Sequence, residues 1–377
     1  MSSDWYRTLG VSAHKGFLKD FHSSDYFVRV SSDLAGEPSY RFALHADGVG
    51  TKGILAYLWW RESGDSHVWQ RLAQDAIVMN TDDLACAGIT EGFVISTTIV
   101  RNPFYIPDEA VQGIIQGVYD FAAQLESLGI AAAVAGGETA DMPDVVRTIG
   151  VEATVAARVA TEKLLPLRVP EQEVWIVGLG SFGQTTYETD YNSGIGCNGI
   201  TAVRHLLLHS SYGEKYPETV APELEHPYQG TYFLSSEVGG YPLGFLLTSP
   251  TRTYLPFLRE AYENYRGAMY AVVHCTGGGQ RKALKYLPST LIRKDNFFPL
   301  PPVFAVLEGK RTWPELFEVL NMGHRMEMYV LPSVAEELLK LAEKYQLPAR
   351  IIGSARKHDG PSRIEAQFQG TSWVWEA

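Results

Sequence analysis

Short strand-like segments that end in glycine turns, alternating with helix-like segments, constrain the fold of this 377-residue chain more than any other feature. Residues 94–100 and 151–159 are rich in β-branched and alternating apolar side chains, which predicts strands. Residues 68–87 and 108–128 repeat apolar side chains at helical spacing. Because strands and helices alternate along most of the length, the pattern predicts an α/β (α+β) fold class.

A polar stretch containing two prolines, residues 161–173, interrupts this pattern. We therefore expect two mixed α/β domains, residues 1–165 and 166–377, which agrees with a typical domain size of about 150 residues. In the second half we expect strands at 174–177, 272–275, 327–331 and a closing strand at 349–352. Helices are expected at 200–208 and 334–345, and residues 210–248 predict a long irregular excursion.

The charge and cysteine content exclude several classes of protein. Forty-three acidic and 32 basic residues give a net charge of −11, which argues against a nucleic-acid partner but not against a small anionic ligand. The three cysteines form no Cys-x-x-Cys pair, so neither a disulfide scaffold nor a structural zinc site is expected. Without a secretory signal or an apolar run of about 20 residues, we expect a cytoplasmic protein with no membrane partner.

The first motif that could carry chemistry directly follows the strand expected at 41–45. It is the glycine turn Asp47-Gly48-Val49-Gly50-Thr51-Lys52. Glycines let a ligand approach the backbone, the acid can hold a metal ion, and the lysine can pair with phosphate. The alternative is a tight turn whose acid and lysine are simply solvated.

Three acidic residues lie on the helix expected at 68–87. Asp75 and Asp82 are seven residues apart and share one face, separated by about 10.5 Å, a length that a polyphosphate with its metal ions could span. Asp83 adjoins Asp82, and two such carboxylates repel unless a cation offsets them. An exposed acidic helix face is the alternative.

Two further glycine motifs end strands. Residues 136–143 contain Gly136, Gly137, Glu138 and Thr139, where Glu138 could ligate magnesium at the end of the strand expected at 130–135. Residues 276–279 read Thr-Gly-Gly-Gly before a helix expected at 280–287, a combination that can bind an anion. Structural turns are the alternative for both.

The order of these motifs resembles the phosphoribosylformylglycinamidine cyclo-ligase family, also called aminoimidazole ribonucleotide synthetases. Residues 47–52 match its Asp-Gly-Val-Gly-Thr-Lys loop, and residues 276–279 match its Thr-Gly-Gly-Gly. Residues 6–11, 79–84, 136–143, 250–254, 313–317 and 321–323 are similar to other family segments, with Asp82 in place of Asn and Asp141 in place of Glu. The resemblance covers nearly the whole chain.

The second half departs from the family pattern. The family loop Ser-Ser-Gly-x-His-Ser-Asn-Gly begins here at residues 180–183, but about ten extra residues, 185–195, precede Gly196-Cys197-Asn198-Gly199. The family histidine has no counterpart in this loop. The departures concern the substrate side of the second domain and leave the nucleotide motifs of the first unchanged.

The resemblance implies a homodimer whose N-terminal sheets close a barrel-like core, with C-terminal mixed sheets flanked by helices. It implies ATP-dependent ring closure of formylglycinamidine ribonucleotide, with ATP and Mg²⁺ as cofactors. The metal would be held by Asp47, Asp82, Asp83 and Glu138. ATP would contact Asp47, Gly48, Gly50, Thr51, Lys52, Asp75, Gly136, Gly137 and Thr139. Catalytic roles would fall to Lys52, Asp83 and Lys15, and substrate contacts to Asn198, Thr276, Gly277, Gly278 and Gly279.

Two alternatives stay open at this point. One keeps the fold and changes the substrate, as in selenophosphate synthetase, thiamin monophosphate kinase or hydrogenase-maturation proteins, which resemble the same superfamily. The chain lacks a reactive Cys before the glycine loop and a Cys at its C-terminus, which argues against two of these. The other is a non-catalytic ATP-binding homologue, motivated by the missing loop histidine.

Overall fold

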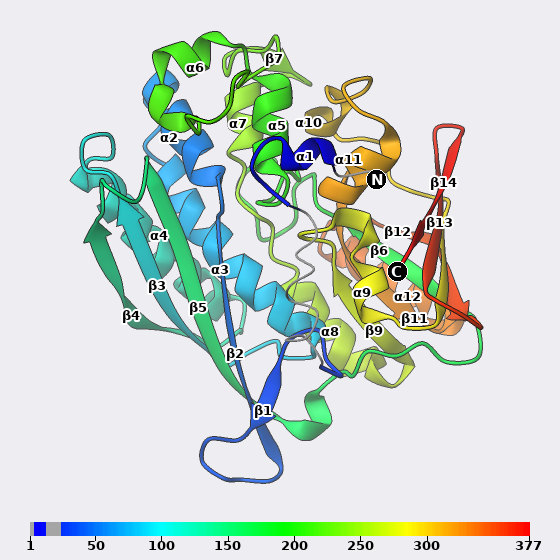
Figure 1. The fold of residues 1–377 in the computed structure, drawn as a ribbon. Coiled ribbons are helices and arrows are strands. Elements are labelled where there is room, and N and C mark those ends of the chain that lie inside the picture. The colour runs from blue at the N-terminus through cyan, green and yellow to red at the C-terminus, as the bar shows by residue number, and fades with distance from the viewer. Residues whose placement is uncertain (1–3, 13–23) are drawn as a thin grey trace.

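The computed structural model describes residues 4–12 and 24–377, and its first half is built on a five-stranded sheet (Figure 1). The strand order is β1-β2-β5-β3-β4, with β3 and β4 parallel and the other pairs antiparallel. The strands are β1 Val30–Ser32, β2 Tyr40–Gly48, β3 Phe93–Arg101, β4 Ala132–Asp141 and β5 Ile149–Ala160.

Among the described residues, helices cover only one face of this sheet. Burial alternates along β3 and β5, which matches the period of two in their sequences. Helices α3 (Val68–Cys86) and α4 (Asp108–Ser127) pack on the covered face. The opposite face stays open, and Leu44, Ala156 and Val94 form one apolar row across it, with Leu44 58% and Val94 46% exposed.

The second half is built on a seven-stranded sheet with the order β14-β13-β10-β12-β6-β11-β9. Strand β11, which pairs with β6 and β9, is buried at every residue, as expected for a strand covered on both faces. Helix α12 (Pro332–Lys344) packs against β6, β12 and helix α8 (Leu255–Tyr265). The strands are β6 Val174–Gly180, β9 Met269–His274, β10 Thr290–Lys294, β11 His324–Val330, β12 Ala349–Lys357, β13 Arg363–Phe368 and β14 Thr371–Glu376.

Helix α3 connects the two halves. It packs on β2 and β5 of the first sheet and also contacts β9 and α8 of the second half, so it runs through the middle of the molecule (Figure 1). The Tyr262 hydroxyl donates to the Ala85 carbonyl (2.8 Å), and the Cys86 sulfur lies 3.5 Å from that of Met326. The polar residues in the last turns of α3 therefore face both halves.

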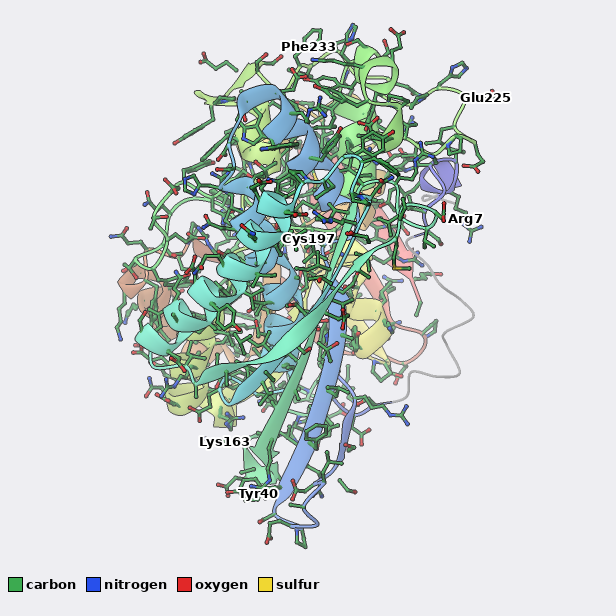
Figure 2. All side chains as sticks on the ribbon, turned by 90° about the vertical axis from the view of Figure 1, so that its left-hand side faces the viewer. Arg7, Tyr40, Lys163, Cys197, Glu225 and Phe233 are labelled. Carbon is green, nitrogen blue, oxygen red and sulfur yellow. The ribbon has the colours of Figure 1, made fainter. Side chains whose placement is uncertain are left out.

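Shorter elements complete the fold. Residues 210–248 fold into short helices and a hairpin of β7 (Glu237–Val238) and β8 (Tyr241–Pro242). Figure 2 shows Glu225 and Phe233 of this segment at one end of the molecule, opposite Tyr40, the first residue of β2, and Lys163, which follows β5. The remaining helices are α1 Asp4–Arg7, α2 Lys52–Ser63, α5 Ile200–Leu207, α6 Ser211–Lys215, α7 Leu243–Leu247, α9 Ala283–Tyr286, α10 Pro302–Ala305 and α11 Trp313–Val319.

The structure confirms the α/β class and corrects several local expectations. Gly136 and Gly137 do not end a strand, because β4 continues through them to Asp141 as an edge strand. The helix expected at 280–287 is a 3-10 turn, Gly279–Arg281, followed by the one-turn helix α9. Strand β12 does not close the chain, since β13 and β14 follow it. The proposed domain boundary at 165/166 falls in the connection between the two sheets.

Candidate active site

The glycine turn after β2 leads directly into helix α2. Gly50 has a φ of 53°, a backbone conformation that favours glycine. Thr51 precedes the helix, and its hydroxyl lies 2.8 Å from that of Thr201 on α5, which joins the turn to the second half. A Cβ on Gly48 would lie 2.1 Å from Glu152 Oε2, so the Glu152 carboxylate packs directly against the backbone of Gly48. The turn therefore lets other groups approach its backbone closely.

Lys52 and Asp75 form a buried ion pair. Lys52 Nζ lies 2.8 Å from Asp75 Oδ1 and donates to the Ser249 carbonyl at 2.5 Å. The amide and hydroxyl of Thr251 also donate to Asp75 Oδ1, at 2.7 and 2.5 Å. Both charged side chains are at most 1% exposed. The pair therefore joins α2, α3 and the segment before α8, and Asp75 is not part of an exposed acidic face.

Asp82 and Asp83 point in different directions from the end of α3. Asp82 accepts hydrogen bonds from the Thr253 hydroxyl (2.9 Å) and the Tyr254 amide (3.1 Å). Burial raises the pKa of Asp82 to about 7, although the charge of Arg325 opposes this. The segment 251–254 therefore covers both Asp75 and Asp82, and the polyphosphate-spanning arrangement of these two acids is not what the structure presents.

Asp83 faces the space between the two halves. Its Oδ1 accepts from His274 Nδ1 at 2.6 Å, and its Oδ2 lies 3.4 Å from His45 Nε2. Burial opposes ionisation, but the charge of Lys282 and the hydrogen bond from His274 hold the pKa of Asp83 well below its usual range. Asp83 is therefore an ionised carboxylate at neutral pH.

The two histidines beside Asp83 come from the ends of strands. His45 belongs to β2, and His274 is the last residue of β9, just before the glycine loop. Arg325 Nε donates to His274 Nε2 at 3.0 Å, so the proton of a neutral His274 sits on Nδ1, facing Asp83. Burial lowers the pKa of His274 to about 4, which keeps it neutral.

The loop of Thr276, Gly277, Gly278 and Gly279 lies at the same end of β9. Gly278 and Gly279 have φ values of 97° and 50°, and a Cβ on Gly279 would lie 2.3 Å from the Phe317 carbonyl. The Lys282 ammonium donates to the Thr276 hydroxyl. Burial opposes its charge, but Asp83 and Asp47 raise the pKa of Lys282. Lys282, rather than Lys52, is the lysine that faces the acids of this cleft.

Asp47 completes the group of acids in the cleft. The Gly48 amide donates to Asp47 Oδ1 at 2.7 Å. Burial and the charge of Asp83 raise the pKa of Asp47, and burial together with Asp47 raises that of Glu152. Lys282 opposes this increase for Asp47 only in part, so a further cation here would stabilise the ionised form of Asp47.

Not all predicted site residues gather here. Glu138 is exposed on the edge strand β4, where its Oε1 accepts from the Thr139 amide at 3.0 Å. Thr98 of β3 pairs with both Glu138 and Glu152, so a whole strand separates these two glutamates. Gly136, Gly137 and Thr139 are exposed with Glu138. Lys15 lies outside the described residues.

Asn198 is the residue of the modified loop that faces the glycine loop. A Cβ on Gly277 would lie 4.0 Å from Asn198 Nδ2, and the buried Asn198 Oδ1 has no hydrogen-bond partner among the described residues. A buried acceptor without a partner is rare in folded proteins. Asn198 therefore retains an unused hydrogen-bonding group next to Gly277.

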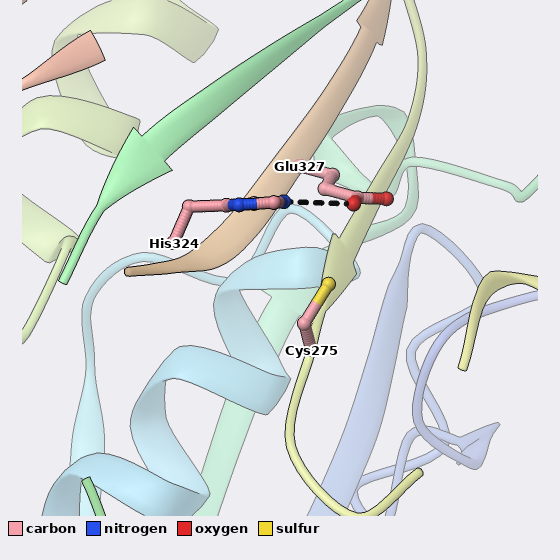
Figure 3. A group of neighbouring side chains, drawn as sticks. All are labelled: Cys275, His324 and Glu327. Atoms are coloured by element: carbon pink, nitrogen blue, oxygen red, sulfur yellow. Dashed lines mark hydrogen bonds and ion pairs between the residues drawn. The ribbon is translucent and has the colours of Figure 1, made fainter. Parts of the chain in front are cut away.

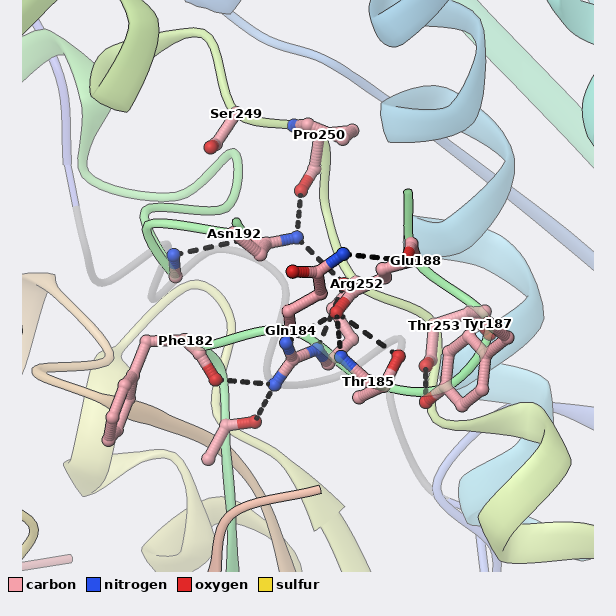
Figure 4. Close-up of polar contacts among 12 residues, drawn as sticks. Phe182, Gln184, Thr185, Tyr187, Glu188, Asn192, Ser249, Pro250, Arg252 and Thr253 are labelled. Carbon is pink, nitrogen blue, oxygen red and sulfur yellow. Dashed lines mark hydrogen bonds and ion pairs between the residues drawn. The ribbon is translucent and has the colours of Figure 1, made fainter. Parts of the chain in front are cut away.

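Extra residues 185–195 are anchored firmly (Figure 4). The buried guanidinium of Arg252 contacts both carboxylate oxygens of Glu188, at 3.0 and 2.5 Å, and donates to the carbonyls of Gly180 and Phe182. The Tyr187 hydroxyl donates to the Thr253 carbonyl at 2.9 Å. A cavity of about 910 Å³ lies between this segment and α3 and α4, lined among others by Arg71, Gln124, Tyr191 and Phe245.

One other cluster has metal-ligating chemistry. Among the described residues, one group of three possible ligands has its ligand atoms within 4.8 Å of one another: Cys275, His324 and Glu327 (Figure 3). However, Glu327 already has partners. Its Oε1 lies 2.5 Å from Lys294 Nζ and 3.1 Å from His324 Nε2, and its Oε2 accepts from the Tyr329 hydroxyl at 2.9 Å. The buried ammonium already neutralises the carboxylate, so we interpret the cluster as a charge-paired core network.

Several cleft residues were not predicted from the sequence: His45, His274, Lys282 and Arg325. His45 and His274 each lie in a strand directly before a glycine turn, and this position is a usable signal. Lys282 and Arg325 carry no comparable signal, because only the packing of β9 against β11 and α3 brings them to the cleft.

Comparisons with known proteins agree with this architecture. Residues 27–159 match the family model "AIR synthase related protein, N-terminal domain". A phosphoribosylformylglycinamidine cyclo-ligase of Thermococcus kodakarensis is 30% identical over 308 residues, covering 81% of this chain and 77% of that protein. The protein of the same name from Methanococcus vannielii is 24% identical, covering 89% and 86%.

Solved structures show the fold alone. T. maritima PurL complexed with ADP matches with a TM-score of 0.55 at 14% identity, covering 98% of this chain and 49% of that one. This chain thus spans about half of that protein. The HypE-HypF complex matches with a TM-score of 0.54 at 12% identity, covering 95% of this chain and 97% of that one.

Across the described residues, no helix is both long and apolar enough to span a bilayer.

Proposed function

Because this chain belongs to the phosphoribosylformylglycinamidine cyclo-ligase family, we propose that it converts formylglycinamidine ribonucleotide to aminoimidazole ribonucleotide in purine biosynthesis, using ATP. The observation that carries the proposal is the meeting of three motif segments in one cleft. Asp47 at the end of β2, Asp83 on α3 and the loop of Thr276 next to Lys282 come together between the two halves.

The chemistry requires an amide-type oxygen to become a leaving group. In the proposed reaction this oxygen attacks the γ-phosphorus of ATP, and the bond to ADP breaks. An amidine nitrogen then attacks the activated carbon, the carbon–oxygen bond to phosphate breaks, and the nitrogen loses its proton. Such a reaction needs mainly positioning and neutralisation of phosphate charge.

The cleft residues match these needs. The ammonium of Lys282 would face phosphate oxygens that enter beside Asp83 and Thr276. Gly277, Gly278 and the nearby Asn198 would contact the ribonucleotide, since Asn198 Oδ1 has an unused acceptor. Lys52 would act from a distance, by fixing α2 and the turn of residues 47–51 through Asp75.

A divalent cation fits part of the predicted ligand set. Asp47 and Asp83 fit, because the charge of Asp83 raises the pKa of Asp47 and Lys282 offsets this only in part. Asp82 is engaged by Thr253 and Tyr254, and Glu138 lies beyond β3, so neither joins them in this arrangement. When bound, the cation would neutralise the triphosphate and favour the release of ADP.

We also propose a homodimer that uses the open face of the five-stranded sheet. The apolar row of Leu44, Ala156 and Val94 supports this, because an exposed apolar sheet face is a common site of association. A second copy presenting the same row would bury it by two-fold symmetry.

The function is tested with purified protein, the ribonucleotide substrate and ATP, by following aminoimidazole ribonucleotide and ADP. We expect ATP-dependent product from the wild type and a fall in kcat of about 100-fold in Asp83→Asn, because this change removes one of the two carboxylates proposed to hold the cation. Asp144→Asn, on an exposed loop, is the matched control and should keep wild-type turnover. ATP binding without any product from the wild type would favour a non-catalytic homologue.

A further inference from the structure

The cavity beside the extra segment 185–195 lies apart from the candidate active site. Arg71 and Gln74 of α3 line it together with Tyr191 of the extra segment. Arg71 lies about 18 Å from Asp83 along α3, at a rise of about 1.5 Å per residue. The volume of about 910 Å³ is within the range of pockets that hold small-molecule ligands. A small molecule can therefore occupy this cavity without entering the cleft.

Two glutamine side chains in the cavity wall have hydrogen-bonding groups to spare. Gln74 Nε2 donates to the Thr251 carbonyl and Gln124 Nε2 donates to the Tyr187 carbonyl, each at 2.8 Å. A carboxamide offers two N–H donors and one acceptor oxygen. Among the described residues neither amide makes another side-chain hydrogen bond, so each keeps one N–H and its oxygen for a ligand. The bonds to the backbone hold both amides in place before a ligand arrives.

Aromatic rings form another part of the wall. Tyr191 stacks on Tyr241 with 4.9 Å between the ring centroids and an interplanar angle of 9°, and Tyr241 stacks on Phe245 at 5.5 Å and 14°. The two outer rings of this stack, Tyr191 and Phe245, line the cavity. Nucleobases stack on aromatic side chains and hydrogen-bond through edges that carry both donors and acceptors. Rings and amides in one cavity therefore match a nucleobase.

The charges around the cavity limit what can accompany the base. Arg71 is the one lysine or arginine among the described lining residues, and its Nη1 lies 3.1 Å from Asp65 Oδ2. Asp120 and Asp190 also line the cavity, and in the part of the chain that the structure describes neither has an ion-pair partner. These acids would repel a triphosphate, whereas a single phosphate could pair with the guanidinium.

We propose that this cavity is a second ligand site, which binds a nucleoside or a nucleoside monophosphate. The base stacks on Tyr191 and hydrogen-bonds with the amides of Gln74 and Gln124, and a phosphate group, where the ligand has one, pairs with Arg71. The inference goes beyond the proposed function, because binding here involves neither the cleft residues nor turnover.

The affinity test is calorimetric titration of the full chain with adenosine and with AMP. We expect both to bind the wild type, and Tyr191→Ala to raise the Kd for each about tenfold or more, because a stacking ring is lost. Arg71→Met should raise the Kd for AMP about tenfold and that for adenosine less than about twofold. Tyr119→Ala is the matched control, since Tyr119 is 54% exposed on α4 and does not line the cavity.

Hydrogen–deuterium exchange of the wild type locates the ligand without any variant. AMP should slow exchange of the backbone amides in residues 187–192, which form one wall of the cavity. Protection confined to residues 47–52 and 276–282, an unchanged Kd in Tyr191→Ala, or no binding of either probe at about 1 mM would overturn the inference. If Tyr191→Ala fails to fold by circular dichroism, the exchange experiment decides. Product formation from the ribonucleotide in the same preparation would leave the proposed function standing whatever the result.

Discussion

At the scale of single residues, the partner of a side chain decides its role more than its type does. Three aspartates of α3 differ completely: Asp75 is closed by Lys52 and Thr251, Asp82 is held by Thr253 and Tyr254, and Asp83 faces the cleft. Helical spacing predicted that Asp75 and Asp82 share a face but not that residues 251–254 cover them. That information lies in a tertiary contact and not in the local sequence.

His205 gives a residue-scale prediction about pH. Its ring is buried on α5, accepts from the Tyr228 amide at 3.1 Å and stacks on the Tyr228 ring. Burial and then Arg204 lower its pKa to about 3. Between roughly pH 6.5 and that value the unfolded chain binds a proton that the folded protein excludes, so stability falls as the pH falls.

The measurement is the free energy of unfolding by urea at pH 7 and pH 5. The wild type should lose about 2 kcal/mol more than His205→Gln over this interval, since Gln can still accept from Tyr228 but does not titrate. An equal loss in both proteins would show that His205 does not exclude the proton. Other carboxyl groups titrate equally in both proteins and cancel in the comparison.

At the scale of elements, the extra segment 185–195 behaves as an integral part of the second half. Arg252 holds Glu188, and Asn321 donates to the carbonyls of Gly194 and Ile195. Tyr191 stacks on Tyr241 of the 210–248 excursion at 4.9 Å. The extra segment 185–195 and the 210–248 excursion therefore pack against each other.

Removal of the Arg252 guanidinium tests this anchoring. Arg252→Met removes the cationic partner of Glu188, whose side chain is 11% exposed and keeps only neutral donors from Thr185 and Asn192, and we expect a loss of about 3–5 kcal/mol in unfolding free energy. Arg293→Met is the matched control: its ion pair with Glu365 is largely exposed and should contribute less than about 1 kcal/mol. Limited proteolysis should cut residues 185–195 faster in Arg252→Met; equal rates and stabilities for both variants would contradict the anchoring.

Elements with a strong local period were predictable, and those determined by context were not. The expected helices at 68–87 and 108–128 correspond to α3 and α4, and the strand at 151–159 to β5. In contrast, β4 continues through Gly136 and Gly137 because pairing with β3 stabilises a segment of weak strand propensity. Helix α2, whose residues lack one clear apolar face, was not predicted.

At the scale of the whole molecule, the open sheet face predicts association. Leu44→Glu places a charge in the apolar row, and in a two-fold dimer that charge would approach its own copy. We expect a wild-type dimer and a monomeric variant by light scattering coupled to size-exclusion chromatography. Leu34→Glu is the control, because Leu34 is 76% exposed but precedes β2. A monomeric wild type would contradict the proposed dimer.

Motifs from both halves of the sequence lie close together in the structure, together with residues that were not predicted. Residues 47–52, Asp83 and residues 276–279 were selected from the sequence and lie in or beside one cleft. Lys282, His274 and Arg325 join them only because β9 pairs with β11 and lies next to α3. The motifs therefore indicated a candidate site, whereas its charge balance could be described only from the structure.

The central claim is that the enzyme activates an amide-type oxygen by phosphorylation before ring closure. The most direct measurement is a turnover with substrate carrying ¹⁸O at that oxygen, followed by mass spectrometry of the inorganic phosphate. We expect one ¹⁸O in each phosphate released, together with one ADP for each aminoimidazole ribonucleotide. Product formed with unlabelled phosphate, or product formed without consumption of ATP, would contradict it.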